Sequence, residues 1–186
     1  MSGVVVAVVG ASGAGKDSLI SYARQRLAEA GVVFVRRVVT RASDADSEDH
    51  DSLEPEAFDA AERAGRFALS WHAHGLRYGL PIALDRDFSQ GRVIVANLSR
   101  AALPALARRY PGVVVVEVSA APAIVARRLA QRGRESGAGV EARLARAAPA
   151  PLPEGAVRLD NSGELAVAGE NFVALLENLL ALRQHA

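Results

Sequence analysis

The chain has 186 residues, half of them hydrophobic, and a formal net charge of +1. We expect a single domain, 1–186, and the small net charge gives no global reason to bind nucleic acid or an anionic membrane. No apolar run reaches the length of a membrane span, the N-terminus lacks a signal-peptide pattern and there is no cysteine, which together are typical of a cytoplasmic protein.

Short apolar runs alternate with helical patterns along the whole chain. Buried strands are expected at Val4–Val9, Val32–Val39, Phe67–Trp71, Leu76–Leu80, Val93–Ala96, Val113–Val118 and Val157–Leu159. Helices are expected at Lys16–Ala30, Glu56–Ala64, from about Pro81, from a Ser99 cap to Arg109, and at Pro122–Arg132, Val140–Ala147 and Glu170–Arg183. The polar stretch 42–52 is expected to be a loop. This alternation predicts an α/β fold with helices on both faces of a parallel sheet.

The first expected strand leads into a glycine-rich turn and then a helix. Glycines let successive backbone N–H groups face a phosphate, the helix adds its positive end, and a lysine at this spacing reaches the β- and γ-phosphates. This order of strand, loop and helix is a P-loop, and it predicts binding of a nucleoside triphosphate. The expected nucleotide-binding residues are Gly10, Ala11, Ser12, Gly13, Ala14, Gly15, Lys16, Asp17 and Ser18.

Asp17 stands where a P-loop ordinarily has a serine or threonine that binds Mg²⁺. A carboxylate is a hard oxygen donor, so Asp17 is a candidate Mg²⁺ ligand. The alternative is that Asp17 is a first-turn acidic residue favoured by the helix dipole, with Ser18 or water completing the metal shell.

Ligands of open parallel sheets bind beyond the carboxyl ends of the strands. The P-loop, Thr40, Asn97 and Ser119 each follow an expected strand. We therefore expect them to share one crevice, although they are far apart along the chain.

Phosphoryl transfer needs positive charge around the moving phosphoryl group. One candidate is Arg41, with Arg36 or Arg37 beside it, and a second set surrounds a glycine-bounded segment that could act as a lid. For each arginine the alternative is a solvated surface residue. The second set is Arg127, Arg128, Arg132, Arg134 and Arg143.

Asp49 and His50 lie in the polar loop, where they could touch a sugar, a metal or a phosphate, or could simply belong to a solvated acidic loop. Trp71, His74 and Tyr78 are placed to line a substrate pocket, and Trp71 could equally be a core residue. Asn161 follows the last expected strand and could hold a nucleotide base or form an Asx turn.

The chain resembles the ribose 1,5-bisphosphate phosphokinase family, which belongs to the guanylate-kinase-like group of P-loop kinases. The resemblance covers nearly the whole chain, and its most specific parts are the Gly-Lys-Asp-Ser form of the P-loop and the Ala-His-Gly-Leu-Arg-Tyr-Gly segment. The motifs that carry it are Gly10–Ser18, Val39–Arg41, Glu48–His50, Trp71–Gly79, Ser99–Ala101 and Asp160–Gly163.

The resemblance implies ATP-dependent phosphorylation of ribose 1,5-bisphosphate to 5-phosphoribosyl 1-diphosphate and ADP, with Mg²⁺, in phosphonate catabolism. It implies a three-layer P-loop fold with an acceptor-binding insert at about 41–80 and a lid at about 133–143. The partner is then a small phosphorylated sugar, without nucleic acid or membrane, and a homodimer is left open. The alternative reading is a nucleoside monophosphate kinase acting on GMP.

Roles for individual residues follow from the same resemblance. The catalytic residues implied are Lys16, Arg41, Arg132, Arg134 and Arg143, and Arg128 and Asn161 join the P-loop around the nucleotide, with Asn161 near adenine. The acceptor would be held by Arg41, Asp49, His50, His74, Tyr78, Asn97 and Arg100. Guanylate kinases carry acidic base-reading residues where this chain has Asn97–Arg100, and this difference favours a phosphate-rich acceptor over a purine.

Overall fold

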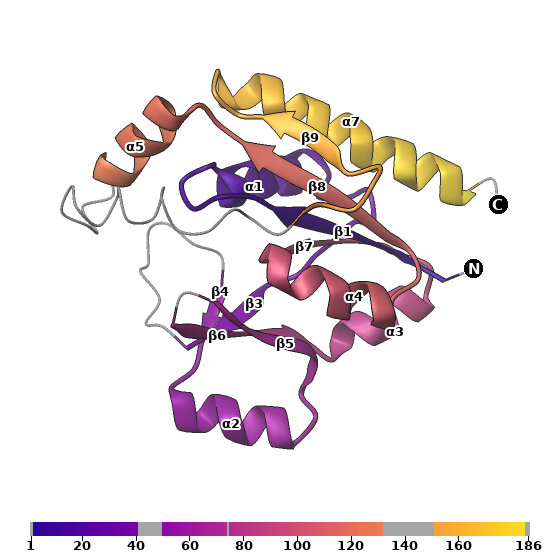
Figure 1. Ribbon diagram of the computed structural model, residues 1–186. Coiled ribbons are helices and arrows are strands. Elements are labelled where there is room, and N and C mark those ends of the chain that lie inside the picture. The colour runs from indigo at the N-terminus through magenta and orange to yellow at the C-terminus, as the bar shows by residue number, and fades with distance from the viewer. Residues whose placement is uncertain (1, 41–49, 74, 132–150, 185–186) are drawn as a thin grey trace.

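The computed structural model describes residues 2–40, 50–73, 75–131 and 151–184 (Figure 1). Its central sheet has five parallel strands in the order β2-β7-β1-β8-β9. They are β2 (Val33–Phe34), β7 (Val93–Asn97), β1 (Val4–Val9), β8 (Val113–Ser119) and β9 (Val157–Asp160). A second sheet has four strands in the order β4-β3-β6-β5. They are β4 (His50–Ser52), β3 (Arg37–Val39), β6 (Leu76–Pro81) and β5 (Phe67–Ala73).

Helices cover both faces of the central sheet, as the alternating pattern predicts. Helices α1 and α7 lie on one face, and α3, α4 and the second sheet lie on the other, with α2 beneath the second sheet (Figure 1). The helices are α1 (Lys16–Arg26), α2 (Pro55–Arg63), α3 (Ala83–Ser89), α4 (Leu103–Arg109), α5 (Pro122–Gln131) and α7 (Leu165–Gln184), with a 3₁₀ turn η1 (Arg100–Ala102) before α4.

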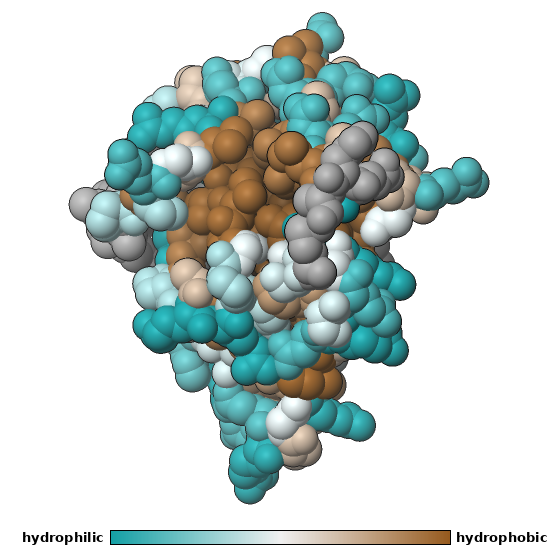
Figure 2. All heavy atoms as spheres, turned by 90° about the vertical axis from the view of Figure 1, so that its right-hand side faces the viewer, coloured by the Kyte–Doolittle hydropathy of each residue, from teal (hydrophilic) through white to brown (hydrophobic). Residues whose placement is uncertain are grey.

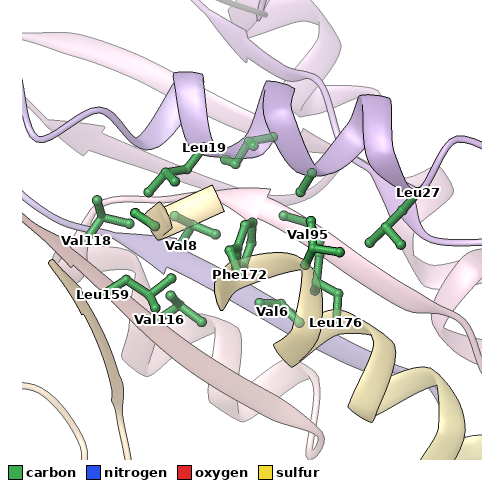
Figure 3. Packing of buried hydrophobic residues seen from close by; sticks show 14 of the residues in the cluster. Val6, Val8, Leu19, Leu27, Val95, Val116, Val118, Leu159, Phe172 and Leu176 are labelled. Atoms are coloured by element: carbon green, nitrogen blue, oxygen red, sulfur yellow. The ribbon is translucent and has the colours of Figure 1, made fainter. Parts of the chain in front are cut away.

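Strand β1 holds the two halves of the core together because successive side chains of a strand point to opposite faces. Val4, Val6 and Val8 pack with α1 and α7, whereas Val5, Ala7 and Val9 pack with α3, α4 and the second sheet. All six are buried. Phe172 of α7 points into the first cluster, between α1 and the sheet (Figure 3).

The expected single strand Val32–Val39 is wrong. The run divides into β2, which pairs with β7 in the central sheet, and β3, which pairs with β4 and β6 in the second sheet. The change occurs at Arg36, an exposed residue whose guanidinium lies 2.9 Å from the Asp51 carboxylate on β4. A charged side chain is costly to bury inside a sheet, and the chain leaves the central sheet at this point.

Several expected boundaries also differ. Helix α1 ends at Arg26, before turns that reach Gly31, and α7 begins at Leu165, before the expected Glu170. His50–Ser52 forms a strand rather than the end of a loop, because it finds a partner in β3. The expected helix Val140–Ala147 lies outside the described residues.

A polar cluster joins α3 to the C-terminal end of α4. The Arg109 guanidinium and the Tyr110 hydroxyl both contact the Asp85 carboxylate, with an Arg109 Nε to Asp85 Oδ1 distance of 3.0 Å. Hydrogen bonding from Arg109 lowers the pKa of Asp85, and burial raises the pKa of Tyr110. The cluster lies against the core and takes no part in the site described below.

Among the described helices, only α7 is long and apolar enough to cross a membrane by length and composition. A core helix passes the same test, and Ala168, Phe172, Val173 and Leu176 of α7 are buried in the core. Figure 2 shows the side of the molecule where the C-terminal end of α7 lies, and apolar side chains gather in the middle of that side within a hydrophilic surround.

Replacing Phe172 by alanine should lower the free energy of unfolding by about 3–5 kcal/mol, because it opens a cavity between α1 and the sheet. Leu182 lies on the same helix but is 69% exposed, so its replacement by alanine should change stability by less than about 0.5 kcal/mol. Urea unfolding of both variants measures the difference, and equal effects would contradict the packing of α7.

Candidate functional site

The turn between β1 and α1 has the shape of a phosphate-binding loop. Gly10, Gly13 and Gly15 have φ angles of 149°, 82° and 93°, which side-chain-bearing residues rarely adopt. A Cβ at Gly10 would overlap the carbonyl oxygen of Val118 on β8, and a Cβ at Gly15 would overlap the side-chain amide of Asn161. Glycine is therefore required at both positions for conformation and for space.

Lys16 is the first residue of α1 and folds back over the loop. Its Nζ donates hydrogen bonds to the carbonyl oxygens of Gly10 and Ala11, both at 2.9 Å. The ammonium group is thus held at the mouth of the loop, next to the positive end of α1. This is the position from which a P-loop lysine meets the terminal phosphates of a nucleotide.

Two residues from the C-terminal half of the chain hold the P-loop through hydrogen bonds to its backbone. Asn161 is 1% exposed, and its Nδ2 donates to the carbonyl oxygen of Ala14 at 2.8 Å. Arg128 of α5 donates to the carbonyl oxygen of Asn161 at 2.9 Å and to that of Ala14 at 3.4 Å. Both expected nucleotide residues therefore lie at the P-loop.

Asp17 joins the loop to the neighbouring strand and to the second sheet. Asn97, at the carboxyl end of β7, donates from Nδ2 to Asp17 Oδ1 at 2.6 Å. The guanidinium of Arg37, on β3, lies 4.0 Å from the same oxygen. The structure thus brings together the P-loop and the end of β7, as the strand-end argument predicts.

A stack of flat side chains continues from Arg37 across the second sheet. The Arg37 guanidinium lies 5.6 Å from the centre of the Tyr78 ring, and the Tyr78 and Trp71 rings are 5.3 Å apart and nearly parallel. Cation–π contact and ring stacking fix all three side chains. From the sequence, Arg37 was expected only as a neighbour of Arg41.

Contrary to the expectation, Thr40 does not follow a strand of the central sheet. Thr40 follows β3 in the second sheet, where its hydroxyl accepts a hydrogen bond from the Arg77 amide at 2.9 Å. Arg77 belongs to the most family-specific segment, but Asp59 and Glu62 of α2 bind its guanidinium. Its charge is used to hold α2 on the second sheet.

Arg100 lies just beyond β7 and pairs with Glu117 of β8. The other carboxylate oxygen of Glu117 lies 3.4 Å from Arg158 on β9. Glu117 was not among the expected site residues, although a lone acidic residue in the apolar run Val113–Val118 is a signal of a specific partner.

The remaining expected residues divide into three groups. His50 is buried, at 2% exposed, on β4, and Ser119 ends β8. Arg127 of α5 and the P-loop residues Ala11, Ser12 and Ser18 are exposed. Six lie outside the described residues: Arg41, Asp49, His74, Arg132, Arg134 and Arg143. Among the described residues no group of three or more acidic or histidine side chains could hold a metal.

Comparison with known proteins identifies the family. No protein-family model matches the chain. The ribose 1,5-bisphosphate phosphokinase PhnN of Chelativorans sp. (strain BNC1) is 48% identical over 182 residues, covering 96% of this chain and 87% of that protein. The chain belongs to the ribose 1,5-bisphosphate phosphokinase family. The protein of the same name from Burkholderia pseudomallei (strain K96243) is 46% identical over 177 residues, covering 94% of this chain and 96% of that protein.

A solved structure confirms the predicted fold of this family member. The guanylate kinase from Anaplasma phagocytophilum matches with a TM-score of 0.68, covering 95% of this chain and 86% of that one. Its sequence is only 15% identical, so the likeness concerns the fold alone. The expected guanylate-kinase-like α/β architecture is confirmed.

Replacing Gly15 by alanine should weaken ATP binding by about tenfold or more, because the new Cβ meets Asn161 and the backbone leaves its preferred region. Isothermal titration calorimetry measures the affinity. Gly31 supplies the control, since its φ is 78° but nothing lies within 4 Å of a Cβ built there. The Gly31→Ala variant should be less stable but should bind ATP with the affinity of the parent protein. Equal ATP affinities of the two variants would contradict the role of Gly15.

Proposed function

We propose that this protein transfers the γ-phosphoryl group of ATP to the 1-phosphate of ribose 1,5-bisphosphate, giving 5-phosphoribosyl 1-diphosphate and ADP in phosphonate catabolism. The observation that carries the proposal is the hydrogen-bonded link from the P-loop through Asp17 to Asn97, with Arg37 beside it. A phosphate-binding loop therefore borders a second, arginine-bearing surface, in a chain that belongs to the ribose 1,5-bisphosphate phosphokinase family.

On the donor side, the amide groups of the loop and Lys16 bind the β- and γ-phosphates of ATP. Arg128 and Asn161 keep the loop in shape through the carbonyl oxygen of Ala14. Asn161 Oδ1 is buried and has no hydrogen-bond partner among the described residues. An acceptor atom in this position supports the proposal that Asn161 contacts the adenine amino group.

On the acceptor side, two multiply charged anions must be held close together, which is the main electrostatic difficulty of this reaction. Arg37 on β3 lies beside Asp17 and Tyr78, and Arg100, in the turn after β7, pairs with Glu117. Both are proposed to supply positive charge on the acceptor side. Arg41, Arg132, Arg134 and Arg143 are proposed to add positive charge. His50, Tyr78 and Asn97, with Asp49 and His74, are proposed to contact the acceptor.

The chemistry requires little of the protein beyond position and charge. The bond from the γ-phosphorus to its bridging oxygen breaks, the electron pair stays on ADP, and an oxygen of the sugar 1-phosphate forms the new bond. That oxygen is already anionic near neutral pH, so no general base is needed. Lys16 and the arginines stabilise the charge that spreads over the transferred group.

Mg²⁺ fits the residues at the start of α1. Asn97 and Arg37 both approach Oδ1 of Asp17, and Oδ2 is the oxygen proposed to serve the metal, directly or through water. Asn97 holds the carboxylate in place by its hydrogen bond. Bound Mg²⁺ neutralises phosphate charge in reactions of this kind.

The purified protein should convert ribose 1,5-bisphosphate, ATP and Mg²⁺ to a product whose ³¹P spectrum contains a new diphosphate on the sugar. GMP is the competing acceptor, and a diphosphate formed only with GMP would replace the proposed function by a guanylate kinase activity. Lys16→Ala should lose turnover with either acceptor while keeping the circular dichroism spectrum of the parent. A reaction without ATP is the control, because ribose phosphate that forms there comes from hydrolysis of the acceptor and not from phosphoryl transfer.

Replacing Asp17 by asparagine should raise the Mg²⁺ concentration for half-maximal turnover by roughly tenfold. Ser18→Ala tests the alternative metal ligand and should leave that concentration unchanged. Because Asp17 also contacts Asn97 and Arg37, the KM for the acceptor should be measured in the same variants. A change in acceptor KM without a change in Mg²⁺ dependence would assign Asp17 to positioning alone.

A further inference from the structure

Several buried polar side-chain atoms have no hydrogen-bond partner among the described residues, and three of them belong to side chains on β5, at the end of β7 and just after β7. They are Nε1 of Trp71, Oδ1 of Asn97 and Oγ of Ser99. Trp71 is 9% exposed and Asn97 7% exposed, so neither can turn its polar atom to bulk solvent. A buried polar group without a partner costs about 1–3 kcal/mol, so three of them in one region require an explanation.

Contacts place the three side chains around one region. Trp71 stacks on Tyr78, Tyr78 meets Arg37, and Arg37 approaches the Asp17 carboxylate to which Asn97 donates. Ser99 follows Asn97 by two residues, and the turn that it precedes packs against β5, the strand of Trp71. The three side chains thus come from β5 of the second sheet, from the end of β7 and from the residues just after β7, and these elements are in contact.

Local structure does not account for these atoms. Ser99 occupies the N-cap position of η1, but its hydroxyl makes no capping hydrogen bond. The amide of Asn97 cannot be turned over to satisfy its oxygen, because Nδ2 must face the Asp17 carboxylate. Oδ1 of Asn97 therefore points away from Asp17.

We propose that Trp71, Asn97 and Ser99 form a neutral subsite that binds the hydroxyl groups of the acceptor sugar. The indole N–H donates, the amide oxygen accepts, and the serine hydroxyl does either. A sugar hydroxyl also does both, so this set matches it. A phosphate dianion has only acceptor oxygens and is repelled by an amide oxygen.

This subsite rests on the proposed function and specifies how it chooses its acceptor. Two cationic side chains neighbour these residues: Arg37 lies over the Tyr78 ring, and Arg100 follows Ser99 and pairs with Glu117. A sugar phosphate matches such an arrangement, because its phosphates can pair with the guanidinium groups while its hydroxyls bind the neutral polar atoms. Trp71 and Ser99 are therefore specificity-determining residues for the acceptor and have no role in binding ATP.

The test compares Trp71→Phe and Ser99→Ala with the parent protein. Phenylalanine keeps an aromatic ring against Tyr78 and removes the indole N–H. Each variant should raise the KM for ribose 1,5-bisphosphate by about 2- to 10-fold, the value of one neutral hydrogen bond, and should leave the KM for ATP unchanged. Ser99→Ala keeps the test decisive if the tryptophan variant fails to fold.

The deciding measurement uses the 2-deoxy and 3-deoxy analogues of the acceptor. If a side chain binds one hydroxyl of the sugar, replacing that side chain should not raise the KM for the analogue that lacks this hydroxyl. Ser70→Ala is the matched control, because Ser70 precedes Trp71 on β5 and its hydroxyl bonds to Glu62 of α2. It should leave every acceptor KM unchanged.

Two results would count against the subsite in different ways. Equal KM increases for the parent acceptor and both analogues would overturn hydroxyl binding and leave only a packing role. Unchanged KM values in both variants would overturn it as well. A wild-type protein that transfers no phosphate to ribose 1,5-bisphosphate would instead refute the proposed function, and this control is measured first.

Discussion

The turn between β1 and α1 has no room for a side chain at Gly10 or Gly15, and the rest of the site is arranged around this constraint. Val118 of β8 crowds the loop on one side, and Asn161, just after β9, crowds it on the other. Because the loop is pressed against two neighbouring strand ends, its amide groups keep one arrangement. The positive end of α1 and the Lys16 ammonium are then held at the same point.

Asp17 extends the influence of that turn into the second sheet. A serine or threonine in its place would carry no charge, whereas the carboxylate attracts the amide of Asn97 and the guanidinium of Arg37. Arg37 in turn lies over Tyr78, which stacks on Trp71. One side chain at the start of α1 therefore connects the nucleotide-binding loop with the sheet on which the acceptor is proposed to bind.

The arginines of this chain differ in the groups to which they bind. Arg77 is surrounded by Asp59 and Glu62, and Arg100 has Glu117. Arg128 instead donates to backbone carbonyl oxygens behind the P-loop. An arginine-rich sequence thus uses some of its guanidinium groups, such as that of Arg77, to hold the scaffold together.

Local patterns in the sequence determined the P-loop, the parallel sheet and most helices, because glycine spacing and hydrophobic periodicity are short-range signals. They also predicted that Asn97 and the loop meet, since strand ends share an edge. Only the tertiary structure decided that Val32–Val39 divides between two sheets, that Glu117 partners Arg100, and that Asn161 and Arg128 support Ala14. Those contacts join residues far apart in sequence, and their energies depend on distances that no local pattern contains.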